Sequence, residues 1–150
     1  MGYISKDGVE VSEERGTSDH EDVNGTVIET TQDKYGVTIT ATFVESLRGA
    51  LLKRIHGANN VTIEAPTATK EGTITVKRNS VELEAGKWVF EMASRRAKKR
   101  KVAPNARVVS TGSQKFVSTE LISYQATIKC YPDENGDSFL EYANLPKLSA

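Results

Sequence analysis

The sequence contains one cysteine, four prolines and one tryptophan in 150 residues, and its formal net charge is zero. The single cysteine, Cys130, excludes an internal disulfide framework and a multi-cysteine metal site, so we expect a reducing compartment. The zero net charge excludes tight binding to nucleic acid or an anionic membrane through the field of the whole molecule. No apolar run approaches the ~18 residues of a membrane span, and the acidic beginning is not typical of a signal peptide. We therefore expect a soluble protein with no membrane partner.

What the sequence has in excess is β-branched residues. Threonine, valine and isoleucine make up 37 of the 150 residues, a composition that favours pleated sheets. The length predicts a single domain over residues 1–150. Tyr35–Glu45 alternates apolar and threonine side chains, as a strand with one buried face does. The spacing of apolar residues then predicts one helix over Ser46–His56, ended by Gly57.

The same alternation predicts several further strands. They are Val61–Glu64, Thr73–Arg78, Lys87–Ser94, Lys101–Ser110, Leu121–Tyr131 and Ser138–Tyr142. Asn135-Gly136 is a strong turn signal and predicts a terminal β-hairpin from Leu121 to Tyr142, with Cys130 in the core. Polar and turn-forming residues predict an exposed loop near residues 13–25, and Asn144–Ala150 is expected to be a free tail.

Charge is strongly segregated along the neutral chain. Met1–Asp33 holds nine acidic and two basic residues, whereas Gly86–Val109 holds eight basic residues and one acidic residue. We expect these regions to meet between copies of the chain. A solvated loop is the second interpretation of the basic run, and nucleic-acid binding is the third, because no aromatic residues interleave with the bases. The candidate contact residues are Glu13, Glu14, Asp19, Glu21 and Asp22 on the acidic side, and Arg95, Arg96, Lys98, Lys99, Arg100 and Lys101 on the basic side.

Residues that could carry chemistry are few. His20 and His56 are the only histidines, and neither has a partner at the spacing of a metal site or a catalytic triad. His56 is interpreted as a cation at the end of the predicted helix, and His20 as part of a solvated acidic segment. Asp133–Asp137 resembles a calcium loop only weakly, because the distal glutamate is missing at the required spacing. We expect no catalytic residue, no cofactor, no metal and no enzyme activity.

Several segments together resemble the major tail tube proteins of long, non-contractile-tailed bacteriophages. The resemblance begins at Gly2–Val9 (GYISKDGV) and continues through Val37–Glu45 (VTITATFVE) to Leu51. It includes Gly57 and Asn60-Val61, and it is strongest at Tyr124–Gly136 (YQATIKCYPDENG) with Glu141-Tyr142. These segments span nearly the whole chain, and their order and spacing carry the match.

The resemblance implies a β-sandwich with a flanking helix, assembled as hexameric rings that stack into a virion tail tube around a DNA-conducting lumen. It implies contacts with other copies of the chain and with other tail proteins, such as the tape measure and the tail tip or terminator proteins. DNA would pass through without specific binding. Segments Glu13–Gly25 and Asn79–Gly86 are the candidates for contacts with adjacent rings. Because a tube that passes DNA should not hold it, we expect the run Arg95–Lys101 to face an acidic protein surface outside the channel.

Overall fold

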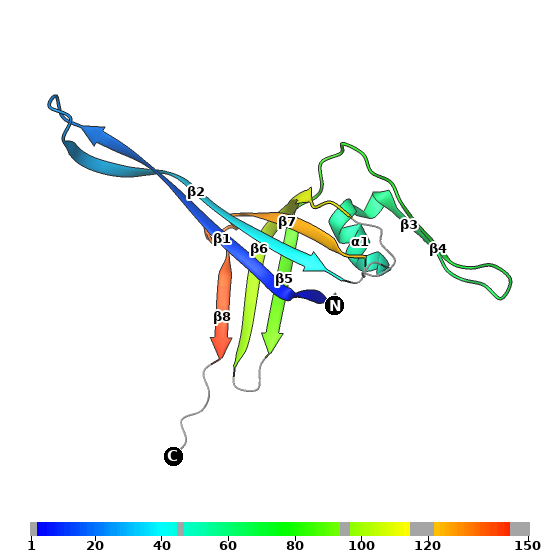
Figure 1. The fold of residues 1–150 in the computed structure, drawn as a ribbon. Helices are drawn as coiled ribbons and strands as arrows, with labels where there is room; N and C mark the ends of the chain where they lie inside the picture. Colours follow the sequence, from blue (N-terminus) through cyan, green and yellow to red (C-terminus); the bar gives the residue numbers. More distant parts are fainter. Residues whose placement is uncertain (1–2, 45–46, 94–96, 115–121, 145–150) are drawn as a thin grey trace, which may run out of the picture.

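The computed structural model describes residues 3–44, 47–93, 97–114 and 122–144, and it shows a mainly β fold with one α-helix (Figure 1). The predicted fold class is thereby confirmed at this level. The elements are β1 (Ile4–Glu21), β2 (Val27–Phe43), α1 (Gly49–His56), a 3-10 turn (Ala58–Asn60), β3 (Val61–Glu64), β4 (Thr73–Val76), β5 (Gly86–Ala93), β6 (Lys98–Thr111), β7 (Tyr124–Tyr131) and β8 (Leu140–Asn144).

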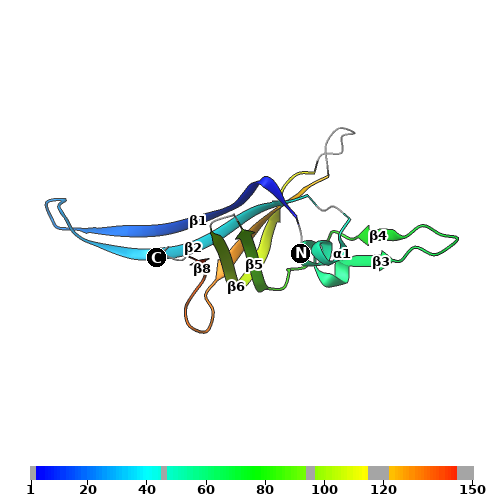
Figure 2. The ribbon, with the colours of Figure 1, turned by 90° about the horizontal axis from the view of Figure 1, so that it is seen from below.

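Six strands form one curled antiparallel sheet. Its order is β1-β2-β7-β6-β5, and β8 pairs with β6 beyond the end of β7. Strands β3 and β4 form a separate two-stranded sheet that projects beside α1 (Figure 2). The β1–β2 hairpin projects from the opposite side of the molecule, as both views show.

The core lies on one face of the curled sheet, against α1. Residues of β2 and β7 alternate as predicted, because Ile39 and Ile128 pair directly across the two strands and are both fully buried. Burying apolar surface is the main force that holds this layer together. The buried core residues are Val37, Ile39, Ala41, Phe43, Leu51, Ile55, Trp88, Phe90, Ala103, Ala106, Val108, Ala126, Ile128 and Cys130.

Helix α1 is shorter than predicted. It begins at Gly49 rather than Ser46, and Ser46 itself lies outside the described residues. A side chain at Gly49 would collide with the end of Ile63 of β3, since an added Cβ would lie 2.0 Å from the Cδ1 atom. The helix ends at His56 as predicted, and Gly57 takes a positive φ of 93° that suits glycine.

The predicted terminal hairpin is wrong. The turn exists, because the amide of Gly136 donates to the carbonyl of Asp133 at 3.0 Å. However, β7 and β8 both run antiparallel to β6 and occupy successive parts of the same side of it. The turn therefore belongs to a loop that leaves the sheet and returns in the same direction, and β8 does not pair with β7.

The exposed loop predicted near residues 13–25 is also wrong in part. Residues 13–21 belong to β1 and pair with β2, and only the turn from Asp22 to Thr26 is irregular. Polar residues form strands here because the hairpin is covered on neither face, so it needs no apolar alternation. The exposure itself was predicted correctly, since residues 17–30 are all exposed. Of the predicted free tail, Asn144 belongs to β8 and residues 145–150 lie outside the described part of the chain.

Candidate self-association surfaces

The acidic ribbon, which we define as residues 13–36, is the part of the β1–β2 hairpin that extends beyond the rest of the sheet (Figure 1). Strand β7 pairs with β2 only from Val37 onward, so no third strand supports the ribbon. Seven acidic and two basic side chains lie on it, and none of its residues is buried. The ribbon is therefore a solvent-exposed, negatively charged projection.

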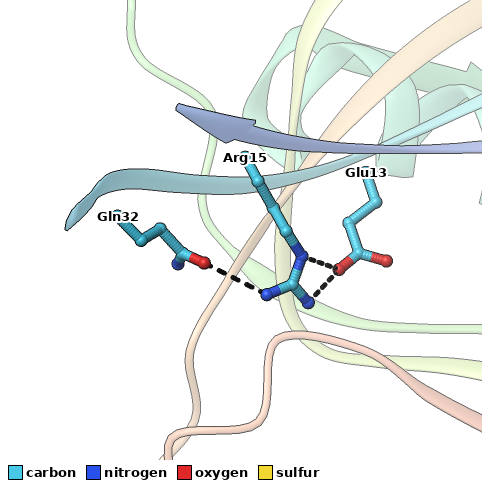
Figure 3. A network of polar contacts seen from close by, with 3 residues as sticks. All are labelled: Glu13, Arg15 and Gln32. Carbon is cyan, nitrogen blue, oxygen red and sulfur yellow. Dashed lines mark hydrogen bonds and ion pairs between the residues drawn. The ribbon is translucent and has the colours of Figure 1, made fainter. Parts of the chain in front are cut away.

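The stem of the acidic ribbon neutralises part of its own charge. Arg15 donates from Nε to Glu13 Oε1 at 3.0 Å and from Nη1 to Gln32 Oε1 at 3.2 Å (Figure 3). Lys34 Nζ lies 2.9 Å from Glu14 Oε1, and this hydrogen bond lowers the pKa of the Glu14 carboxyl. These exposed pairs fix the stem but contribute little to stability. Two of the predicted acidic contact residues, Glu13 and Glu14, are thus already paired within the chain.

The outer end of the ribbon keeps its negative charge. The amides of Asn24 and Thr26 donate to Asp22 Oδ1 at 2.8 and 2.9 Å, and these backbone hydrogen bonds lower the pKa of the Asp22 carboxyl. Gly25 closes this turn with a φ of 80°. Within the described residues, no basic side chain pairs with Glu21, Asp22 or Glu29. The charge that remains available to another molecule is therefore concentrated near the turn.

The basic segment, Lys98–Lys101, begins strand β6 and runs between β5 and β8. Arg100 Nε donates to Glu91 Oε1 at 2.7 Å, and Lys99 Nζ lies 3.2 Å from Glu141 Oε1. Lys98 and Lys101 have no acidic partner among the described residues. The predicted contact residues Arg95 and Arg96 lie outside the described part of the chain. The predicted basic run is thus partly a strand, and half of its described charge is paired within the molecule.

The two strands at the ends of the sheet order, β1 and β5, have open edges, and β8 also pairs on one side only among the described strands. Among the described strands, β1 pairs only with β2, and β5 pairs only with β6. A pocket of about 250 Å³ separates the beginning of β1 from the end of β5, and its walls include Ile4, Val9, Phe90 and Met92. The curled sheet therefore brings its two edges near one another without joining them.

The sequence pattern does not identify a second basic cluster. A pocket of about 410 Å³, which we call the α1 pocket, lies between the end of α1, residues 77–83 and the end of β6. Lys77, Arg78 and Arg107 line it, and Arg107 is separated from the adjacent pair Lys77-Arg78 by strand β5 and two connections. Only the fold brings them together, so no local charge run could have indicated the cluster.

The structure does not bring the predicted acidic and basic residues together within one chain. The acidic ribbon and the basic segment project in different directions (Figures 1 and 2). Among the described residues, no group of three His, Cys, Asp or Glu side chains is placed to hold a metal ion, and no helix is long and apolar enough to cross a membrane. Comparison with known proteins finds no family model that matches the sequence and no match among curated proteins.

Proposed function

We propose that this chain is a structural subunit of a bacteriophage tail tube, which assembles with copies of itself into stacked hexameric rings around a DNA-conducting channel. The resemblance of its sequence segments to tail tube proteins supports this function, and so does the mainly β fold with one helix. The observation that carries the proposal is the pair of open edges, β1 and β5, on one curled sheet.

Open edges favour joining of sheets between copies. The outer side of an edge strand presents unpaired amide and carbonyl groups, which bind readily to another strand. Pairing β5 of one copy with β1 of the next would continue the sheet, and a closed ring of such sheets leaves no free edge. Met92, an exposed wall residue of the pocket between the two edges, would be covered in such a ring.

The acidic ribbon supplies a second reason to expect a partner. A two-stranded hairpin without a third strand is only marginally stable in water, and this one has no buried residue to anchor its outer half. Contact with another copy would stabilise the ordered ribbon and offset the conformational entropy that is lost when the ribbon is ordered. In the proposed tube the ribbon contacts a basic surface of an adjacent subunit.

Electron microscopy of the purified protein at high concentration tests the proposal. We expect rings or hollow tubes, together with large species in sedimentation velocity. A protein that stays monomeric at the highest concentration and shifts a labelled DNA duplex at physiological salt contradicts the proposal.

Charge reversal within the basic segment tests which surface takes part. We expect Lys98→Glu or Lys101→Glu to weaken assembly, and we expect the wild-type assembly to weaken as salt rises, because these two lysines have no acidic partner within the described chain. Lys53→Glu, an exposed charge reversal on α1, is the matched control. Tubes that form normally with both variants but conduct DNA poorly would place the basic segment in the channel instead.

Nucleic-acid binding through the basic run is the second candidate, and one observation favours it. Tyr142 of β8 lies opposite Arg100 in the sheet and is 55% exposed, so it supplies an aromatic side chain that the basic run lacks in sequence. Against it, Arg100 and Lys99 are already paired with carboxylates. If this function holds, Tyr142→Ala lowers DNA affinity without altering the oligomeric state, which gel-shift and sedimentation measurements distinguish.

A further inference from the structure

The α1 pocket combines an apolar floor with a cationic rim. Ile55, Leu83 and Val108 supply apolar walls, and Lys77, Arg78 and Arg107 supply the positive charge. Its volume of about 410 Å³ is large enough for a few side chains of another chain. The pocket thus suits a ligand that is apolar at its tip and negatively charged beside it.

The charges around the α1 pocket are incompletely balanced. Arg107 pairs with Glu82, but Arg78 donates only to the amide oxygen of Gln114 at 2.7 Å, and Lys77 Nζ has no partner among the described residues. His56 lines the same pocket, is about nine-tenths buried, and its Nε2 atom makes no hydrogen bond in the described part of the chain. A buried polar atom without a hydrogen-bond partner is uncommon in a folded protein. Glu82, the carboxylate among the lining residues, is already paired with Arg107. The positive charges of Lys77 and Arg78 are therefore left without an acidic partner among the described residues.

The outer end of the acidic ribbon has the complementary composition. Val23 lies at the turn and is completely exposed. Glu21 and Asp22 precede it, and neither has a basic partner among the described residues. The ribbon end thus presents one apolar side chain next to two carboxylates.

Helix α1, whose end lines the pocket, lies on the opposite side of the molecule from the outer end of the β1–β2 hairpin, as both ribbon views show. The pocket and the ribbon end cannot meet within one chain, so a contact between them must join two copies. Such a contact is head-to-tail, and repeating it produces an open filament or a closed ring rather than a symmetric dimer.

We propose that the α1 pocket receives the ribbon end of a second copy, with Val23 against the apolar floor and the carboxylates of Glu21 and Asp22 beside Lys77 and Arg78. This inference rests on the proposed function, since it requires that the chain binds copies of itself. It assigns the ribbon end to the α1 pocket rather than to the basic segment. The stem carboxylates of Glu13 and Glu14, which are already paired, take no part in it.

Cysteine cross-linking between two singly substituted proteins tests the contact. One protein carries Val23→Cys and a mass tag, and the other carries Val81→Cys, an exposed position that lines the pocket. Under mild oxidation we expect on the order of tenfold more mixed dimer than for Val23→Cys with Thr69→Cys, because docking raises the local concentration of the two thiols. Thr69 is the control, since it is also exposed but lies in the β3–β4 connection, which neither lines the pocket nor belongs to an open edge of the six-stranded sheet. The native Cys130 is buried and does not interfere.

Charge reversal supplies a second, independent measurement. Arg78→Glu and Glu21→Lys should each lower the yield of mixed dimer by on the order of tenfold, and the two reversed proteins mixed together should recover it. Both residues are exposed, so circular dichroism should show that the variants fold as the wild type does.

The outcomes separate this inference from the proposed function. Rings or tubes that form while the 23–81 dimer stays at the level of the control overturn the inference and leave the tail tube function standing. A strong 23–81 dimer without rings or tubes supports the contact and contradicts the tail tube function. A protein without any self-association overturns both.

Discussion

His56 shows how burial changes the role of a single residue. Its position at the end of a predicted helix suggests a cation that complements the helix dipole. The structure instead buries the ring edge-on against Tyr124, with ring centroids 5.8 Å apart. Burial, and next the positive charge of Arg78, lower the pKa of the His56 imidazole. Burial and the charge of Arg78 therefore disfavour the cationic form on which the interpretation of His56 as a dipole-stabilising cation rests.

The lowered pKa of His56 predicts that the stability of the protein decreases in acid. The unfolded chain binds a proton at the ordinary pKa of histidine, whereas the folded chain binds it only at lower pH. Between those two values the unfolded state holds more protons, so the free energy of unfolding decreases as pH falls, by at most about 1.4 kcal/mol per pH unit. Urea denaturation from pH 7.5 to pH 5 measures this slope. We expect His56→Gln to reduce it, whereas an equal slope in both proteins would show that another group causes it. His20 is exposed and common to both proteins.

Cys130 was predicted to lie in the core, and the structure confirms it, since the side chain is 4% exposed. Burial raises the pKa of its thiol from 9.0 to about 11. At pH 8 this lowers the thiolate fraction roughly 100-fold, so we expect iodoacetamide to modify the native protein at least that much more slowly than the urea-unfolded protein. Mass spectrometry of timed samples gives both rates. Similar rates would mean that the β7 region opens readily in the native state.

At the scale of elements, the strand periodicity of β2 was predicted correctly and its limits were not. Val37, Ile39, Ala41 and Phe43 are buried as expected, but Tyr35 of the same predicted face is 47% exposed. The reason is that β7 pairs with β2 only from Val37 onward. Alternation in a sequence indicates which face of a strand is apolar, but it cannot indicate how far the neighbouring strand extends.

The β2–β7 pair predicts that substitutions on the two faces of the sheet lower the free energy of unfolding by very different amounts. Ile39→Ala removes a fully buried side chain that pairs with Ile128, and we expect it to lower the free energy of unfolding by about 2–5 kcal/mol. Thr40→Ala, the next residue on the opposite face, should cost less than about 1 kcal/mol. Urea denaturation compares the two variants. Equal losses would contradict the assignment of the core to one face.

The pairing of β8 could not be predicted from the sequence. Turn-forming residues determine only the local turn, whereas the strand with which β8 pairs depends on the rest of the sheet. Asp133–Asp137 forms the expected turn, with the Asp137 amide donating to Asp133 Oδ1 at 2.9 Å. Which strand receives the chain after the turn depends on β6, whose first half needs a neighbour beyond the end of β7. That requirement depends on the whole sheet, so the sequence near residue 135 does not indicate it.

At the scale of the whole molecule, the segregation of charge was evident from sequence and its placement was not. The acidic excess near the N-terminus becomes a projecting ribbon only because β1 and β2 are both longer than the rest of the sheet. The cluster of Lys77, Arg78 and Arg107 arises from two segments that are far apart in the sequence, so the sequence indicated only one of the two basic surfaces. The available acids were also fewer than expected, since Glu13 and Glu14 are paired within the ribbon.

Shortening the ribbon should separate folding from assembly. Joining Arg15 to Tyr35, which face each other across the hairpin, through an Asn-Gly turn removes residues 16–34, none of which is buried. We expect the free energy of unfolding to change by less than about 1 kcal/mol and self-association to be lost. Thermal melting and sedimentation velocity measure the two effects.

The β3–β4 hairpin provides the matched control. Joining Glu64 to Thr73 by the same turn shortens the other projecting ribbon and should leave assembly intact. If assembly survives loss of the acidic ribbon, the ribbon is not part of the contact between copies.

The paired register of the acidic ribbon makes its length a molecular ruler. Adding two residues to each strand moves the turn outward by about 7 Å and keeps every side chain on its original face. Adding one residue to each strand instead rotates the tip to face the other way. The reach of each copy toward its neighbour is therefore adjustable in fixed steps, and related chains that differ only in hairpin length would space their neighbours at correspondingly different intervals.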